Sequence, residues 1–253
     1  AGPPGGWVRA LLACGWLTGR TSSGPFWNRS GPGVLGSQEP RLVHARSSSV
    51  AVKTESESPK EGHGGVHAVD VARAHGVETM FTLSGAHVFP MYDGAVKAEP
   101  AMPIIDVRHE PSAVFAAEAI GKLTRKPGLA VLTAGPGVTN GVSPITQAHF
   151  SGSPLVVIGG RAPTGRWGMG SLQELDHPPI FQTVSKSATT ASKVEDIAPT
   201  VDEAFNLAGS SHRGPAFVDV PMDQFFSSTT VDKQSNGSTV AAIAPDADAL
   251  GAI

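Results

Sequence analysis

The first candidate for chemistry in this sequence is a carboxylate that follows an apolar stretch. Residues 104–107 read "IIDV", and the triplet Arg108-His109-Glu110 follows directly, before a proline. At the boundary between a strand and a helix, Glu110 could simply interact with the helix dipole, which contributes about 0.3–1 kcal/mol. It could instead share a proton with a ligand, provided that a dry pocket favours its neutral form. The residue types alone leave both interpretations open.

A histidine follows two very small residues in the segment "TLSGAHVFP", residues 82–90. Gly85 and Ala86 are small enough to let a ligand or another stretch of backbone approach closely. His87 then stands at the start of a helical pattern. Taken alone, this loop favours a capping or packing histidine slightly over a catalytic one, so its interpretation depends on what lies around it.

A glycine-rich turn occurs in "VLTAGPGVTNGV", residues 131–142. A strand, a turn and a helix in this order can present backbone N–H groups to a ligand. The turn does not fit a dinucleotide-binding fingerprint, because Asn140 stands where the third glycine is needed and the next strand lacks the expected acid. A phosphate-binding P-loop is excluded as well, since no G-x-x-x-x-G-K-[ST] occurs in the sequence.

A long loop, residues 159–177, follows another apolar stretch and reads "GGRAPTGRWGMGSLQELDH". It combines glycines with arginine, tryptophan and glutamine side chains. Loops of this length within a compact domain are usually functional or mobile. This loop is therefore the fourth segment that could carry chemistry.

These four segments can lie together only if the elements before them end at one edge of a sheet. Between residues 66 and 226, short apolar runs alternate with longer helical patterns. The apolar runs predict strands, and the periodic segments between them predict helices. We expect strands at 77–83, 102–107, 128–134, 153–160 and 214–220, and helices at 67–76, 88–98, 111–124, 138–152 and 193–210.

Strands that are apolar throughout and separated by helices indicate a parallel sheet covered on both faces. Right-handed crossovers then produce a doubly wound α/β domain, with a parallel sheet of about six strands and helices on both faces. In such a sheet, ligands bind beyond the carboxyl ends of the strands. The four segments follow those ends, so we expect them to form one site.

The two flanks differ from this central region. Residues 1–61 are turn-rich, contain no acid before Glu39 and carry spaced arginines, a composition found in organelle transit peptides. We expect a disordered tail there, either a transit peptide for a mitochondrion or plastid or a plain tail on a cytoplasmic protein. Residues 228–253 are polar and alanine-rich, and we expect a linker leading into the start of a truncated middle domain.

Composition excludes several other classes of function. A formal net charge of −3 gives no reason to expect nucleic acid or an anionic membrane as a partner. The single cysteine, Cys14, can form neither an intrachain disulfide nor a thiolate metal site, and the histidines lack metal-binding spacing, so we expect no metal site in this chain. No apolar run reaches the roughly 20 residues that a membrane span needs.

Taken together, "FTLSGAH", "IIDVRHE", "LTAGPGVTNG", "SPLVVIGG" and "GSLQELDH" resemble the N-terminal, pyrimidine-binding domain of thiamine diphosphate (ThDP) enzymes. The resemblance runs from about residue 63 to residue 226, with the order and spacing of the motifs kept. It is greatest for the acetolactate synthase-like branch, which also includes the 2-hydroxyacyl-CoA lyases. We expect this domain to occupy residues 62–227.

The resemblance implies a role for Glu110. In the family, this glutamate hydrogen-bonds N1′ of the cofactor's aminopyrimidine, which helps the 4′-nitrogen to remove the thiazolium C2 proton. The resemblance also implies that Gly85, Ala86 and His87 line the active site, and that Gln173 reaches the substrate. Glu110, His87 and Gln173 are thus the predicted catalytic residues. The predicted cofactor-binding residues are Gly85, Ala86, Glu110, Thr133, Gly135, Gly137 and Asn140.

Family members hold the diphosphate and Mg²⁺ with a G-D-G motif in a separate domain, and this motif does not occur in the sequence. The resemblance therefore implies a dimer or tetramer that shares ThDP with another domain, binds Mg²⁺ and in some branches FAD outside this segment, and acts on small 2-oxo or 2-hydroxy acids. On its own, the segment is expected to be inactive.

Two alternatives to an acetolactate synthase-like enzyme stay open. The "SGAH" segment departs from typical acetolactate synthases and is closer to 2-hydroxyacyl-CoA lyases. The chain could also be a non-catalytic, stand-alone pyrimidine domain with a binding or regulatory role.

Overall fold

The computed structural model describes residues 59–231. The predicted N-terminal tail and the predicted C-terminal linker lie almost entirely outside the described residues. The α/β domain expected between them lies within the described range.

A six-stranded parallel sheet forms the centre of the domain, with the strand order β3-β2-β4-β5-β7-β6. All five strand pairings are parallel, which confirms the predicted fold class. Five of the strands overlap the segments in which the sequence predicts them. The strands are β2 (Met80–Thr82), β3 (Ile104–Asp106), β4 (Gly128–Leu132), β5 (Leu155–Arg161), β6 (Ser187–Thr190) and β7 (Pro215–Pro221).

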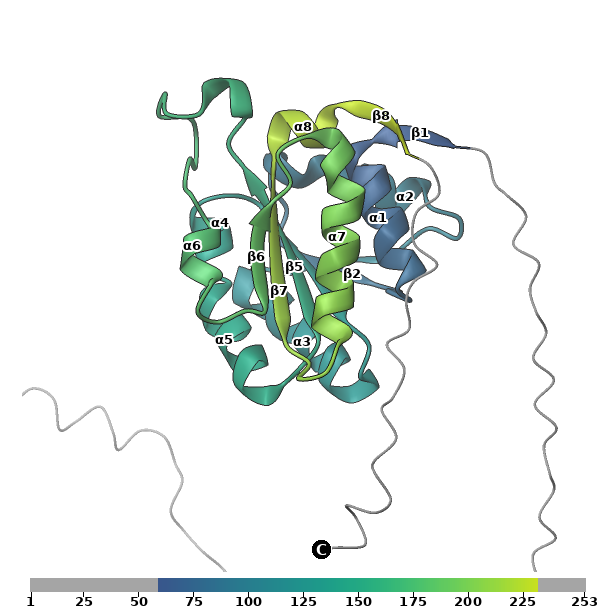
Figure 1. Cartoon of the computed structure of the whole chain (residues 1–253), viewed down its shortest axis with the longest axis vertical. Coiled ribbons are helices and arrows are strands. Elements are labelled where there is room, and N and C mark those ends of the chain that lie inside the picture. The colour runs from purple at the N-terminus through teal and green to yellow at the C-terminus, as the bar shows by residue number, and fades with distance from the viewer. Residues whose placement is uncertain (1–58, 232–253) are drawn as a thin grey trace, which may run out of the picture. The chain divides into compact units, whose positions relative to one another are not determined.

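Helices cover both faces of this sheet, as the continuous apolar strands require (Figure 1). The principal helices are α1 (Gly64–Ala74), α2 (Phe89–Lys97), α3 (Glu110–Thr124), α5 (Val142–Ser151) and α7 (Val194–Gly209). Shorter helical turns are η1 (Ala86–Val88), α4 (Pro136–Thr139), η2 (Thr164–Arg166), α6 (Pro178–Phe181) and α8 (Met222–Phe226).

The core consists of two hydrophobic clusters, one on each face of the sheet. Successive residues of β4 alternate between them: Leu129 and Val131 pack with α1, α2 and α7, whereas Ala130 and Leu132 pack with α3, α5 and α6. This alternation follows from the two-residue period of a strand. Because every residue of β4 is buried, the strand reads as uninterrupted apolar sequence.

Residues at the start of α3 and at the end of α5 explain why these helices begin and end where they do. α3 begins at Glu110 and has Pro111 in its first turn, where a proline costs no hydrogen bond. α5 ends at Ser151, and Gly152 directly after it has a φ of 59°, the left-handed conformation common at helix ends. A sharp start for α3 gives its first residue, Glu110, a defined direction at the edge of the sheet.

Three features differ from the prediction. β6 has the polar sequence "SATT" and lies at the edge of the sheet, so no apolar run in the sequence predicts it. The single helix expected at 138–152 is two helices, α4 and α5, with Asn140 and Gly141 between them. Finally, β1 (Lys60–His63) and β8 (Ser228–Val231) form a separate antiparallel pair at the two ends of the described chain.

Candidate functional site

The four segments singled out in the sequence all follow the carboxyl ends of strands. Residues 83–87 follow β2, residues 107–110 follow β3, residues 133–137 follow β4, and the long loop 162–177 follows β5. Because the strands are parallel, these segments meet at one edge of the sheet. In Figure 1, the long green loop rises beyond that edge at the upper left.

Glu110 lies beside Asn140 and Gly137. The side-chain amide of Asn140 donates a hydrogen bond of 2.9 Å to Oε2 of Glu110. Oε1 points towards Gly137, where a Cβ atom would stand 3.5 Å from it. Within residues 59–231, Oε1 accepts no hydrogen bond from the protein. The turn after β4 thus fixes the carboxylate through one oxygen and leaves the other available.

Arg108, the first residue of the charged triplet, does not pair with Glu110. Its guanidinium donates to Asp106 at 2.5 Å and to the carbonyl of Val107. The hydrogen bond from Arg108 lowers the pKa of Asp106 below its usual value, although both groups lie at the surface. The charge of Arg108 is therefore used locally, whereas Glu110 contacts the turn after β4 and Asn140.

His87 is buried at the end of the segment after β2, within η1. Its Nδ1 lies 3.4 Å from the hydroxyl oxygen of Thr133. The glycine at position 160 leaves room for His87, because a Cβ atom on Gly160 would stand 2.4 Å from the Cβ atom of His87. Burial lowers the pKa of His87 below its usual value, and contact with the backbone of Leu172 opposes that shift. A neutral imidazole, able to give or accept a proton, is therefore favoured.

Gly85 and Ala86 lie beside this histidine. A Cβ atom on Gly85 would come within 2.2 Å of the Thr133 hydroxyl oxygen, so the segment after β2 packs directly against the turn after β4. Ala86 begins η1 and is exposed. The structure thus brings three of the predicted site residues, Gly85, His87 and Thr133, into one contact.

The backbone groups of the turn after β4 form hydrogen bonds within the protein. The N–H of Gly137 donates to the carbonyl of Ala134, and the N–H of Gly135 donates to Nε2 of His177 at 3.0 Å. The carbonyl of Thr133 accepts from Gly160 at 2.6 Å. The turn therefore does not offer these N–H groups to a ligand, contrary to one expectation from its sequence. It presents a surface of small residues instead.

Gln173 lies on the long loop and packs against this turn. A Cβ atom on Gly135 would come within 2.9 Å of the Cβ atom of Gln173. Gln173 itself has a φ of 58°, a left-handed conformation that is uncommon for a residue with a side chain. The loop therefore approaches the turn closely at this point.

Sequence reasoning did not find three residues that support this arrangement: Arg161, His177 and Asp219. Asp219 accepts hydrogen bonds from both of the others, and its side chain is wholly buried. One signal could have pointed to it. An acid in the middle of the apolar strand "PAFVDVP" has to be paired, because an unpaired buried carboxylate is very costly.

The described part of the chain shows neither a metal-binding cluster nor a membrane-spanning helix. No group of three or more His, Cys, Asp or Glu side chains there could hold a metal ion. No helix among those residues is long and apolar enough to cross a membrane.

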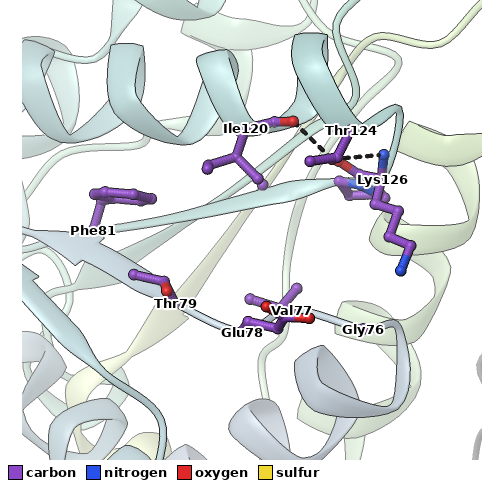
Figure 2. Close-up of a pocket in the computed structure, with 10 residues that line it drawn as sticks. Gly76, Val77, Glu78, Thr79, Phe81, Ile120, Thr124 and Lys126 are labelled. Atoms are coloured by element: carbon purple, nitrogen blue, oxygen red, sulfur yellow. Dashed lines mark hydrogen bonds between the residues drawn. The ribbon is translucent and has the colours of Figure 1, made fainter.

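A separate hollow of about 200 Å³ lies at the opposite edge of the sheet, near the amino ends of β2 and β4. Figure 2 shows Ile120, Thr124 and Lys126 across it from Val77 and Glu78. None of the predicted site residues lines this hollow. It is therefore distinct from the edge that carries Glu110.

Comparison with known families agrees with this geometry. Residues 63–180 match the model of the family described as "Thiamine pyrophosphate enzyme, N-terminal TPP binding domain". These residues therefore carry the N-terminal TPP-binding domain of this family. The match includes the segments that carry Glu110, His87 and Gln173, and it lies within residues 59–231, which the structure describes.

Curated relatives of this TPP-binding domain come from two kinds of enzyme. The acetolactate synthase large subunit of Mycobacterium tuberculosis is 54% identical over 155 residues, which are 61% of this chain and 28% of that protein. The 2-hydroxyacyl-CoA lyase 2 of Danio rerio is 40% identical over 182 residues, 72% of this chain and 29% of the lyase. The human 2-hydroxyacyl-CoA lyase 2 is 38% identical over 172 residues, 68% of this chain and 27% of the lyase. The chain thus spans less than a third of the length of these relatives.

Proposed function

We propose that this domain supplies the pyrimidine-binding side of the active site in a ThDP-dependent carboligase or C–C lyase that acts on 2-oxo or 2-hydroxy acids. The observation that carries the proposal is the arrangement of the Glu110 carboxylate. One oxygen is held by Asn140, and the other points towards Gly137, where no side chain covers it. The names of the relatives, acetolactate synthase and 2-hydroxyacyl-CoA lyase, support an enzyme of this kind.

In the proposed site, the carboxyl group of Glu110 shares a proton with the aminopyrimidine of the cofactor. Because Asn140 donates to Oε2, the direction of Oε1 is fixed, and Oε1 can share a proton with N1′ of the aminopyrimidine. When bound, ThDP would supply an electron sink for the electron pair left on the substrate carbon that was the carbonyl carbon. Sharing a proton requires surroundings that disfavour the ionised carboxylate. Glu110 is only partly buried within residues 59–231, so the cofactor and another part of the enzyme would complete those surroundings.

His87 and Gln173 would face the reacting groups from the other side of the turn. A buried, neutral imidazole can move a proton to or from a substrate oxygen. Gln173 can orient that substrate, since its amide both donates and accepts hydrogen bonds. Gly85, Ala86, Thr133, Gly135 and Gly137 would form the small-residue surface against which the aminopyrimidine lies.

The substrate class has two candidates. The higher identity to an acetolactate synthase subunit favours a carboligase that joins 2-oxo acids. The "SGAH" segment around His87 favours a 2-hydroxyacyl-CoA lyase, and relatives of that name match a longer part of the chain. A non-catalytic domain with a binding or regulatory role is the third candidate. ThDP binding with no turnover of either substrate class would identify it.

Other properties of the whole enzyme follow from the same proposal. The chain spans 28% of the acetolactate synthase relative, so we propose that parts of the enzyme outside residues 59–231 hold the diphosphate and Mg²⁺, and FAD where that branch uses it. We further propose that two copies of the enzyme share each site through this domain, and that the arginine-rich residues 1–61 direct the protein to an organelle.

The test is exchange of the C2 proton of ThDP bound to the natural full-length protein. Glu110→Gln keeps the size of the side chain and one hydrogen-bonding oxygen but cannot share an acidic proton. We expect exchange to slow by roughly 10²–10⁴-fold, the usual contribution of general acid–base catalysis. ThDP affinity should fall much less, because most of the cofactor's contacts do not involve this carboxylate.

Glu118 on the same helix provides the matched control. It is buried, accepts a hydrogen bond of 2.6 Å from Ser153 and lies about two turns further along α3 than Glu110. Glu118→Gln should lower thermal stability while leaving C2 exchange near the wild-type rate. Wild-type exchange in Glu110→Gln would mean that Glu110 acts only as a helix-end carboxylate, and the proposed function would then lose its central residue.

A further inference from the structure

The side chain of Asp219, in the carboxyl half of β7, accepts three hydrogen bonds although it is wholly buried. Oδ2 accepts from Nη1 of Arg161 at 3.0 Å and from Nδ1 of His177 at 2.9 Å. Oδ1 accepts from the hydroxyl of Thr190 at 2.5 Å. A buried carboxylate with this many donors is fully paired, so its position is strongly fixed.

Both ends of the long loop meet at this one carboxylate. Arg161 is the last residue of β5 and precedes the loop, whereas His177 is the residue that ends it. Arg161 also donates to Asp176 at 2.9 Å, and its guanidinium lies 3.9 Å above the centre of the Trp167 ring. The loop 162–177 is therefore anchored at its beginning, in its middle and at its end.

The geometry determines which nitrogen of His177 carries the proton. Nε2 accepts the N–H of Gly135, so it must be unprotonated. Nδ1 therefore carries the hydrogen and donates it to Asp219. Because a buried imidazole has only these two partners, the carboxylate of Asp219 selects the tautomer that can bind the Gly135 backbone.

His177 thereby ties the long loop to the turn after β4. On one side, its ring accepts the N–H of Gly135, and on the other side of the same glycine the Cα and Cβ atoms of Gln173 pack closely. Gly137 and Asn140, further along the same turn and helix start, contact Glu110. A shift of Gly135 would therefore change the distance between Gln173 and Glu110.

We propose that His177 and Asp219 are positioning residues that clamp the loop bearing Gln173 onto the Gly135 turn. This inference rests on the proposed function for its effect on catalysis, since it takes Gln173 as the group that orients the substrate. The clamp itself is a property of the 253-residue chain and can be measured without any cofactor.

The test separates the two hydrogen bonds of His177 by side-chain length. The amide of Gln reaches the position of Nε2 and can accept from Gly135, whereas the shorter amide of Asn reaches the position of Nδ1 and can donate only to Asp219. In the 253-residue chain, we expect His177→Asn to raise hydrogen exchange of the Gly135 amide about 10-fold, because that buried donor has lost its partner. His177→Gln should keep exchange close to the wild-type value.

The same variants in the natural full-length protein test the effect on catalysis. His177→Asn should lower kcat/KM by up to about 100-fold through a displaced Gln173, with ThDP affinity changed less than the substrate KM. His177→Gln should restore most of that loss. Asp176→Asn, which removes only the charge of the outer partner of Arg161, is the control and should leave both measurements unchanged.

The outcomes distinguish the clamp from the proposed function. Equal Gly135 exchange in the Gln and Asn variants would overturn the clamp, as would ¹⁵N shifts showing that Nε2 of His177 is protonated in the wild type. The second measurement needs no variant, so it decides the matter even if His177→Asn does not fold. A full-length wild type that neither binds ThDP nor turns over substrate would overturn the proposed function, while Gly135 exchange would still report on the clamp.

Discussion

The two edges of the sheet use glycine for different purposes. At the amino-end edge, Gly128 and Gly121 let backbone approach backbone: a Cβ atom on either would come within 2.0 Å of a carbonyl oxygen, that of Ala117 or Pro154. At the carboxyl-end edge, Gly137 and Gly160 let side chains approach, namely those of Thr133, Glu110 and His87. Glycine at the amino-end edge therefore serves folding, and at the carboxyl-end edge it admits groups that could do chemistry.

The same contrast holds for polar groups. The carboxyl-end edge contains buried, paired side chains such as Asp219, His177 and His87. The hollow at the amino-end edge is lined by Val77, Phe81 and Ile120, with the exposed side chains of Glu78 and Lys126 at its border. Burying polar groups costs free energy unless each is paired. That cost is borne at the edge where the predicted site residues meet, and towards the amino-end edge the buried pair of Glu118 and Ser153 bears it too.

The largest effect is expected from Gly128→Ala. The added methyl group would collide with the backbone of α3, which cannot move without displacing the helix from β4. We expect a loss of about 3 kcal/mol or more in the free energy of unfolding, towards the upper end for an overpacked core. Urea denaturation of the 253-residue chain measures it. A loss as small as that of a surface substitution would contradict the role assigned to glycine at this edge.

A smaller effect on stability, but a larger one on function, is expected from Gly137→Ala. Its methyl group would meet Cγ2 of Thr133 at 2.5 Å, the end of a side chain that can rotate, and Oε1 of Glu110 at 3.5 Å. We expect a loss of about 1 kcal/mol in the free energy of unfolding. In the full-length protein, C2 exchange of ThDP should fall about 10-fold or more through misplacement of Glu110.

Gly128→Ala and Gly137→Ala together test the comparison between the two edges. If Gly137→Ala unfolds the domain while Gly128→Ala is tolerated, the contrast between the edges is reversed. If Gly137→Ala changes neither stability nor exchange, the turn after β4 does not control the position of Glu110.

The smallest effect is expected from Gly165→Ala, on the long loop. No heavy atom lies within 4 Å of the position that the new Cβ atom would occupy, and the residue lies in the short helical turn η2. Alanine can adopt this conformation, so the substitution should stabilise the folded chain by about 0.4–1 kcal/mol by restricting the unfolded state. A rise in the midpoint of thermal unfolding would show it, whereas a fall would mean that the loop needs a glycine here.

Much of the fold could be predicted because its signals are local. Five of the strands are apolar runs, and the start of α3 is marked by Glu110 and Pro111. The predicted site segments were found for the same reason, since each follows such a run. β6 was not found, because its residues "SATT" lie at the edge of the sheet and need no apolar character.

The partners of individual polar groups could not be predicted. Nothing near Asp219 in the sequence indicates that it bonds Arg161, His177 and Thr190, which lie 29 to 58 residues away. The N–H of Gly135 is a similar case, since a glycine-rich turn can offer its N–H groups either to a ligand or to the protein. Only the folded arrangement decides between these partners, because it depends on how distant elements pack.

The antiparallel pair β1–β8 makes the domain suitable for insertion into another protein and for circular permutation. Lys60 lies opposite Val231, so the chain enters and leaves the described domain on neighbouring strands. A segment whose two ends are adjacent can be inserted into a surface loop of another protein, or circularly permuted with a short joining peptide, with little distortion of either partner. Because β1 and β8 pair, the domain can be joined to another protein at one place on its surface.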